Sequence, residues 1–275
     1  SPSPVLNTRM QPKHHGSRKK SMARIIAVAN QKGGVGKTTT SINLAASLGR
    51  KGGKVLLIDG DPQGNASSGV GVRPALKSPT LYTFLTDAAS PIPTVRPFPE
   101  LELDLIPANA DLAAVEWELR SLEEPERILA TRLEELGDAY SYILIDCPPS
   151  LGMLTINSLI AADSVLIPLQ CEYYAMEGLT LLLETVRKVK LGWNPHLVLE
   201  GIFFTMFDRR NNLAHQVVNE VRKHFSRVFK TMIPRNIRLS ECPSFGQPVN
   251  LYDPNCAGAQ AYAALADEIL AESGK

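Results

Sequence analysis

The fold is decided by residues 30–39, which read Asn30-Gln31-Lys32-Gly33-Gly34-Val35-Gly36-Lys37-Thr38-Thr39. Before this stretch, residues 25–29 form a short apolar run that is typical of a buried strand. After it, Leu44 and Leu48 recur at helical spacing. A strand, a glycine-rich loop, Lys-Thr and a helix, in this order, predict a phosphate-binding loop. The alternative is a chance glycine turn after the strand, and the complete ten-residue context disfavours it.

The chemistry of phosphate binding explains these residue types. Glycines allow backbone N–H groups to close around phosphate oxygens, and the helix N-terminus adds unpaired donors and the positive end of a dipole. Lys37 can then reach the β- and γ-phosphates of a nucleotide, and the Thr38 hydroxyl can bind Mg²⁺. The residues expected to hold the phosphates are Lys32, Gly33, Gly34, Val35, Gly36, Lys37, Thr38 and Thr39.

The loop departs from the common G-x-x-x-x-G-K-[ST] pattern at its first position, where Gln31 replaces glycine, and it contains a second lysine, Lys32. In this form it resembles the deviant Walker A loop of the ParA/MinD group of ATPases. The resemblance implies that ATP is the nucleotide and that Lys32 reaches across a dimer interface to the nucleotide of the partner. Spacing alone shows only that a second cation lies near the phosphates.

A second predicted strand, residues 54–58, runs into Asp59-Gly60-Asp61-Pro62-Gln63-Gly64-Asn65. Acids at the carboxyl end of a buried strand beside a phosphate site suit metal or water chemistry, whereas a simple turn before proline and glycine is the structural alternative. The segment resembles the D-x-D-P-Q-G-N segment of the same group, which implies that Asp61 orients the hydrolytic water. Gly60 replaces the bulkier residue expected there, and we expect it to loosen this segment.

A third strand, residues 142–145, runs into Asp146-Cys147-Pro148-Pro149-Ser150, which resembles a Walker B element. Asp146 is expected to hold Mg²⁺ through water, opposite Thr38. The expected catalytic residues are therefore Lys32, Lys37 and Asp61, and the expected metal-binding residues are Thr38 and Asp146.

Strands and helices alternate along the rest of the chain, which predicts an α/β fold with a doubly wound, mostly parallel sheet flanked by helices. We expect a single P-loop ATPase domain over residues 23–275. Residues 111–137 are expected to be helical with a break near Glu124, and Trp117 is expected in the core. Residues 74–107 are proline-rich, with a short helix near 81–85 and a strand near 101–106. The remaining predicted strands are residues 164–168, 197–205 and 228–233, and the last helix is 258–271.

Charge is unevenly distributed. The chain carries 29 Lys and Arg against 28 Asp and Glu, for a net charge of +1. Residues 1–22 hold five of the cations and no acid, so the rest of the chain has a net charge of −4. We expect residues 1–22 to be a disordered basic tail, either a solvated leader or a weak polyanion-binding segment, and we expect any nucleic-acid binding by the folded part to depend on a local patch.

The resemblance extends over about residues 24–271, in motif order and spacing, and is to ParA/Soj-type chromosome or plasmid partition ATPases. It implies that ATP drives formation of a sandwich homodimer, that the dimer binds double-stranded DNA without sequence preference, and that a ParB-type partner stimulates slow hydrolysis and releases it. It also implies that Pro234 and Asn236 contact the base of the bound nucleotide and that Arg210 and Arg238 contact DNA. A cytoplasmic, nucleoid-associated protein is implied as well. The alternative for both arginines is an ordinary solvated side chain.

Two other interpretations share the fold. A MinD-type membrane-cycling ATPase needs a basic amphipathic C-terminal helix, but the last stretch here carries Asp267, Glu268 and Glu272, which anionic lipid would repel. A metabolic P-loop enzyme, such as an ATP-dependent carboxylase or amidotransferase, shows no pocket signature here. The four cysteines form no C-x-x-C pair, which fits thiols in a reducing cytosol and excludes closely spaced iron–sulfur ligands.

Overall fold

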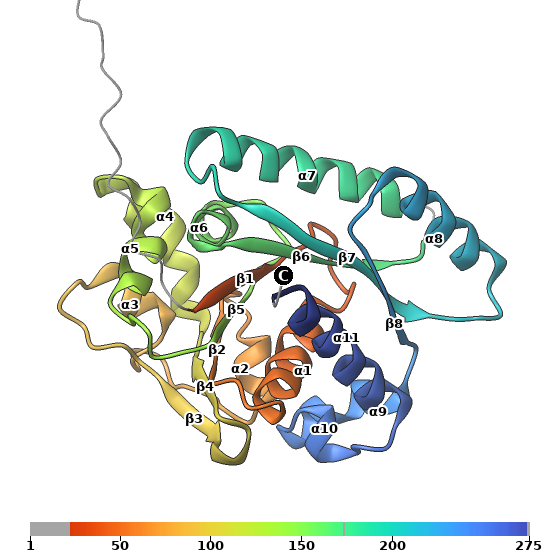
Figure 1. The fold of residues 1–275 in the computed structure, drawn as a ribbon. Helices are drawn as coiled ribbons and strands as arrows, with labels where there is room; N and C mark the ends of the chain where they lie inside the picture. Colours follow the sequence, from red (N-terminus) through yellow and green to blue (C-terminus); the bar gives the residue numbers. More distant parts are fainter. Residues whose placement is uncertain (1–22, 173, 274–275) are drawn as a thin grey trace, which may run out of the picture.

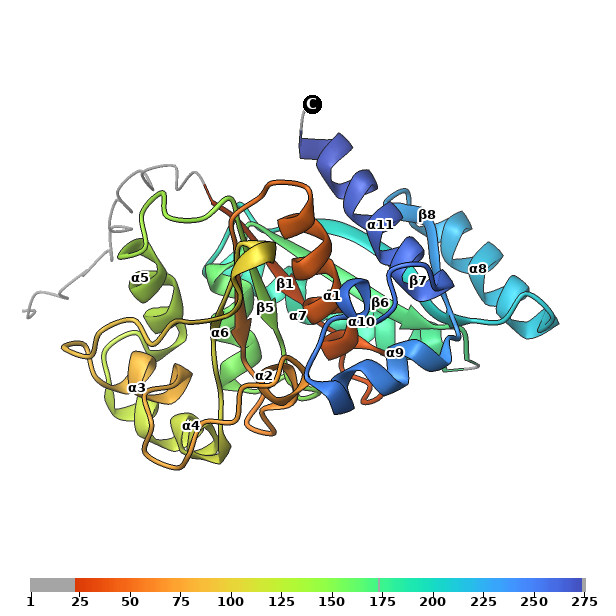
Figure 2. The ribbon, with the colours of Figure 1, turned by 90° about the horizontal axis from the view of Figure 1, so that it is seen from below.

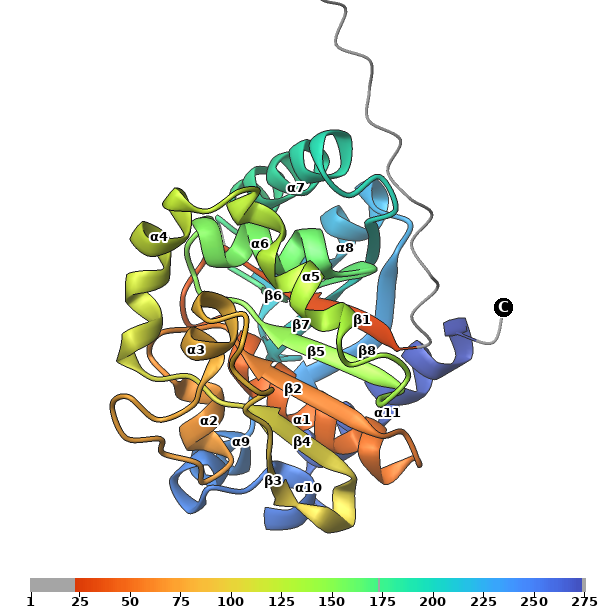
Figure 3. The ribbon, with the colours of Figure 1, turned by 90° about the vertical axis from the view of Figure 1, so that its left-hand side faces the viewer.

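The computed structural model describes residues 23–172 and 174–273. Its centre is one eight-stranded sheet in the order β3-β4-β2-β5-β1-β6-β7-β8, with every neighbouring pair parallel except β3 and β4 (Figures 1 and 3). The predicted mostly parallel sheet is thereby confirmed, whereas the expected basic tail lies outside the described residues. The strands are β1 Arg24–Val28, β2 Val55–Asp59, β3 Val95–Phe98, β4 Leu103–Ile106, β5 Tyr142–Asp146, β6 Ser164–Gln170, β7 Val198–Phe207 and β8 Val228–Pro234.

Helices cover both faces of the sheet because its central strands are apolar on both sides. One face packs against α1 Lys37–Arg50, α2 Asn65–Gly69, α9 Ile237–Glu241, α10 Val249–Tyr252 and α11 Ala257–Ser273 (Figure 2). The other packs against α3 Leu81–Thr86, α4 Val115–Glu118, α5 Ile128–Glu134, α6 Met153–Ala161, α7 Ala175–Gly192 and α8 Asn212–His224. Within the described residues, no helix is long and apolar enough to cross a membrane.

The prediction for Trp117 is wrong, since its side chain is 72% exposed. The helix α4 is only four residues long; Val115 at its start and Leu119, in the 3-10 turn that follows it, face inward and are fully buried. Trp117 therefore points outward, where the Arg120 guanidinium lies 4.6 Å from its ring centre.

The antiparallel strand β3 was not predicted from the sequence. It contains Pro97 and lies at the edge of the sheet, where the missing N–H of a proline costs no hydrogen bond between strands.

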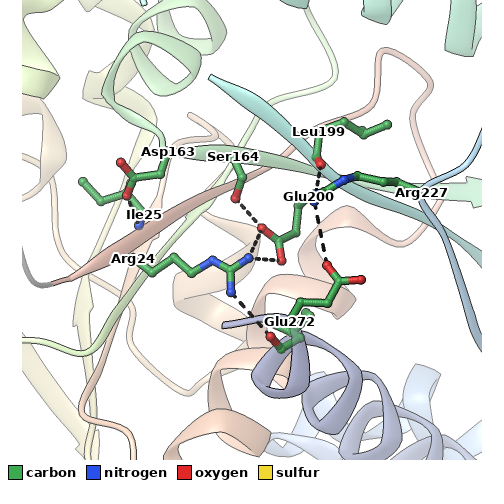
Figure 4. A network of polar contacts seen from close by, with 9 residues as sticks. Arg24, Ile25, Asp163, Ser164, Leu199, Glu200, Arg227 and Glu272 are labelled. Carbon is green, nitrogen blue, oxygen red and sulfur yellow. Dashed lines mark hydrogen bonds and ion pairs between the residues drawn. The ribbon is translucent and has the colours of Figure 1, made fainter. Parts of the chain in front are cut away.

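A polar clasp joins the amino ends of β1, β6 and β7 (Figure 4). The guanidinium of Arg24 donates to both carboxylate oxygens of Glu200, at 2.6 and 2.7 Å, and the Ser164 hydroxyl donates to the same carboxylate at 2.6 Å. Arg24 also donates to the Ile269 carbonyl of α11 at 3.4 Å. Glu200 is 1% exposed, so this charge is buried and its pairing holds the end of the sheet opposite the phosphate loop.

Candidate nucleotide-binding site

The predicted phosphate loop connects β1 to α1 at the carboxyl edge of the sheet. Gly34 and Gly36 have φ angles of 74° and 90°, a conformation that favours glycine, and Gly36 is the N-cap of α1. The Thr205 hydroxyl of β7 donates to the Val35 carbonyl at 2.8 Å, and its methyl lies 3.6 Å from where a Cβ at Gly36 would be. The loop is therefore held against β7 with its backbone open at the helix N-terminus, which is a ready anion site.

Lys37 is 7% exposed and lies beneath this loop. Its ammonium donates to the Lys32 carbonyl at 3.0 Å. Burial lowers the pKa of Lys37, and the charges of Asp146, Cys147 and Asp61 oppose that shift. A phosphate group bound in the loop would bring an anion into direct contact with the buried ammonium.

Asp59 and Asp146 end the neighbouring strands β2 and β5 and are partners in the strand register. Asp146 is fully buried, and one of its oxygens accepts a hydrogen bond from the Ser41 hydroxyl at 2.8 Å, while Oδ2 has no hydrogen-bond partner. Burial, followed by the charge of Asp59, raises the pKa of Asp146 to about 7. An orphaned carboxylate oxygen behind the Thr38 position fits a hydrated Mg²⁺, whose positive charge would favour the ionised form.

The structure corrects the expectation for Gly60. Its N–H donates to the Asp146 carbonyl at 2.9 Å, and a Cβ at this position would lie 2.7 Å from the same oxygen. Glycine therefore brings the segment after β2 into direct contact with the Asp146 backbone, and the expected loosening does not follow. Asp61, one residue further on, is 8% exposed, and its Oδ1 accepts the Gln63 N–H at 2.9 Å.

One cavity of about 580 Å³ gathers most of the expected site residues. Its lining includes the phosphate loop, Asp61 and, from the segment after β8, Pro234 and Asn236. Asn236 also caps α9 by accepting the Arg238 N–H at 2.9 Å. The cavity is also lined by residues that were not predicted from the sequence, among them Thr205, Met206 and Arg235. The position of Thr205 and Met206 at the end of a buried strand is the signal that could have found them.

The other expected residues do not line this cavity: the buried Val35 and Asp146, and the exposed or partly exposed Lys32, Arg210 and Arg238. Lys32 is exposed and forms an ion pair with Glu172 of the loop after β6. Arg210 follows β7, is 90% exposed and pairs with Asp208 at 3.2 Å. Arg238 lies on α9 and is bound by Glu241 at 2.9 Å and Asp253 at 3.3 Å. The two arginines therefore occupy separate elements and do not form one cluster in the single chain.

A glycine loop over a helix N-terminus, a buried lysine and acids on adjacent strands define the class as a P-loop nucleotide-binding protein. Residues 23–199 match the family model described as an AAA domain. The chain is 53% identical over 251 residues to the sporulation initiation inhibitor protein Soj of Bacillus subtilis, covering 91% of this chain and 99% of that protein. It is 52% identical over 250 residues to the chromosome partitioning protein ParA of Myxococcus xanthus, covering 90% and 88% of the two chains.

Among solved structures, one described as cobyrinic acid a,c-diamide synthase from Mycobacterium smegmatis with bound ATP analog and magnesium is similar in fold. It has a TM-score of 0.80 and 36% identity, and the match covers 92% of this chain and 97% of that one. From the two curated relatives, this chain belongs to the Soj/ParA family of chromosome-partitioning ATPases.

Proposed function

We propose that this protein is a partition ATPase that binds and hydrolyses ATP with Mg²⁺ and moves chromosomal or plasmid DNA. The observation that carries the proposal is the shared cavity. The phosphate loop lines it together with Asp61, Pro234 and Asn236, which supports the proposal that the last two contact the nucleotide base. The relatives that are about half identical over nearly the whole chain support the same function.

Each residue then has a distinct task. The loop N–H groups and Lys37 bind the phosphates and offset the negative charge that develops on the transferred phosphoryl group. Asp61 accepts a hydrogen bond from the attacking water and orients it. Thr38 and, through water, Asp146 would hold Mg²⁺, which would offset the negative charge of the phosphates when bound. Lys32 lies outside the cavity of its own chain, which suits a role at the nucleotide of a partner.

DNA binding is proposed for the edge of the sheet that carries the loops after β7 and β8. A groove beside the nucleotide cavity is lined by five basic side chains and one acid, Asp208. The five are Arg209, Arg210, Arg222, Lys230 and Arg235. Two copies of this surface in an ATP-bound dimer would double the number of phosphate contacts, so DNA affinity would depend on ATP without any change in the arginines. We further propose that a ParB-type partner stimulates hydrolysis and that the protein acts in the cytoplasm on the nucleoid.

The test is sedimentation with and without ATP, and with and without unrelated duplex DNA, for the wild type, Arg210→Glu and Arg227→Glu. Arg210 lines the basic groove. Arg227 is a matched control because it is a half-exposed arginine in an ion pair, with Glu272, and it lies just before the start of β8, at the other end of that strand. Loss of two phosphate contacts per dimer should reduce the slope of log affinity against log salt by about 1.8 in Arg210→Glu. ATP-independent DNA binding, or an equal effect of both variants, would refute the proposed surface.

A second function is suggested by the similar structure described as a cobyrinic acid a,c-diamide synthase. An amide-forming enzyme couples ATP use to a carboxylic acid acceptor, whereas a partition ATPase needs none. We expect phosphate release from ATP in the presence of Mg²⁺ and DNA with no small-molecule acceptor. Turnover that starts only after an acceptor and an amine donor are added would favour the amide-forming alternative.

A further inference from the structure

The lysine that distinguishes this phosphate loop is already paired in the single chain. The Nζ of Lys32 forms a salt bridge with Oε2 of Glu172, and both side chains are nearly half exposed, at 45% and 44%. The two residues are 140 positions apart in the sequence and come from loops after the neighbouring parallel strands β1 and β6. Because parallel neighbours end at the same edge of the sheet, the fold itself brings this pair together.

The backbone fixes both partners of the pair. The Lys32 N–H donates to Oδ1 of Asn30 at 3.0 Å, and the Asn30 amide donates to the Pro168 carbonyl of β6 at 2.7 Å. On the other loop, the Glu172 N–H donates to the Gln170 carbonyl at 2.9 Å, and the Glu172 carbonyl accepts the Ala175 N–H at 3.0 Å. The ion pair is therefore held by two anchored loops.

From this geometry we infer that Glu172 is a positioning residue that holds Lys32 inside its own chain until a nucleotide-loaded partner arrives. The inference rests on the proposed ATP-dependent dimer. If Lys32 bound the phosphates of a second chain while still paired with Glu172, the Glu172 carboxylate would lie beside those anions and repel them. We therefore expect dimerisation to break one Lys32–Glu172 pair in each chain, so that the pair opposes dimerisation and raises the concentration at which it occurs.

The surroundings of Glu172 limit the cost of this release. Glu172 and Arg235 line the same cavity of about 410 Å³, together with Asp208 and Asn211. Among the described residues, the Arg235 side chain forms no ion pair, and it also lines the nucleotide cavity. The space beside the carboxylate that Lys32 leaves behind is therefore bordered by one cation, Arg235, and one further acid, Asp208.

The experiment measures the dimer dissociation constant by analytical ultracentrifugation with Mg²⁺ and a non-hydrolysable ATP analogue. The variants are Glu172→Gln, Glu172→Ala and the control Glu177→Gln, which removes an exposed acid from the first turn of α7 without touching Lys32. Exposed ion pairs are weak, and two are broken per dimer, so both Glu172 variants should dimerise about 2- to 30-fold more tightly than the wild type. The Glu177→Gln control should have the dimer dissociation constant of the wild type. The difference in this constant between the wild type and the Glu172 variants should become smaller at higher salt, because salt screens the ion pair.

The possible failures are distinguishable. A wild type that stays monomeric with the analogue refutes the proposed ATP-dependent dimer itself. If the wild type dimerises with the analogue but the Glu172 variants dimerise equally tightly or more weakly, the role of Glu172 is refuted. Thermal melts and affinity for the analogue should be unchanged, which would show that the variants are folded. If Glu177→Gln tightened dimerisation as much as the Glu172 variants, the effect would come from net charge alone and the inference would be overturned.

Discussion

The buried pair of Arg24 and Glu200 offers a sharp test of the fold, through the substitution Arg24→Met. Methionine keeps most of the apolar stem but removes the guanidinium, which leaves the carboxylate of Glu200 with the Ser164 hydroxyl and no cation at 2.6–2.7 Å. Removing one partner of a buried ion pair costs about 3–5 kcal/mol. Because the Arg24 side chain is 25% exposed and water can reach it, we expect the lower end of this range, about 3 kcal/mol.

Calorimetry or thermal circular dichroism measures the effect. For a chain of this size, about 1 kcal/mol shifts Tm by about 2–4 °C, so Arg24→Met should lower Tm by about 6–12 °C. The double variant Arg24→Met/Glu200→Met should recover most of this loss, since two apolar side chains need no counter-charge. ATP affinity at low temperature should be unchanged, because the pair lies at the amino ends of the strands and the phosphate loop lies at their carboxyl ends.

Lys51→Met is the matched control. Lys51 is 28% exposed and pairs with Asp267 at 2.6 Å, so its own exposure and its distance resemble those of Arg24, but Asp267 is 65% exposed. Loss of this surface pair should cost about 0–1 kcal/mol. Two results would contradict this reasoning: equal Tm shifts in Arg24→Met and Lys51→Met, or a double variant no more stable than Arg24→Met. Either would show that the burial of Glu200 does not determine how much stability is lost when Arg24 is removed.

Three further substitutions test the site. Lys37→Ala should abolish measurable ATP binding in calorimetric titration, since it removes the buried ammonium beneath the loop; wild-type affinity would contradict its phosphate role. Asp61→Ala should bind ATP normally yet release phosphate at least about 100-fold more slowly in a phosphate-release assay, and undiminished turnover would move the water-orienting role elsewhere. Gly60→Ala should lower Tm by several degrees and slow hydrolysis, because its Cβ meets the Asp146 carbonyl; a variant as stable and active as the wild type would show that β2 and β5 separate easily here.

Features that depend on a short stretch of sequence are predictable. The apolar runs before Asn30, Asp59 and Asp146 determine buried strands, and the residues just after them must lie at one edge of a parallel sheet. The sequence alone therefore predicts that the phosphate loop, Asp61 and Asp146 lie close together. The edge strand β3 escapes such reasoning because a four-residue strand containing Pro97 has no clear pattern.

Features that depend on packing are not predictable in this way. Trp117 is apolar and lies in a helical segment, yet Val115 and Leu119 fill the inward positions and leave it exposed. The pair of Lys32 and Glu172 joins loops 140 residues apart, and although the sequence singles out Lys32, nothing in it indicates Glu172 as the partner. Such contacts follow from strand order, which the spacing of the motifs does not supply.

Gly60 shows why a motif departure depends on its three-dimensional surroundings. In the sequence, a missing side chain suggests a freer segment. In the fold, its N–H binds the Asp146 carbonyl at 2.9 Å, and this short approach is possible only without a Cβ.

The turn is also fixed on its other side by Asp59. One Asp59 oxygen accepts the Asp61 N–H at 3.2 Å, and the other accepts the N–H and hydroxyl of Ser67, both at 2.7 Å. Asp61 therefore sits between two fixed points, the Asp59 carboxylate and the backbone of the strand that ends in Asp146. A Cβ at position 60 would lie 2.7 Å from the Asp146 carbonyl, so a larger residue there would have to move this turn, and Asp61 with it, relative to one of the two points.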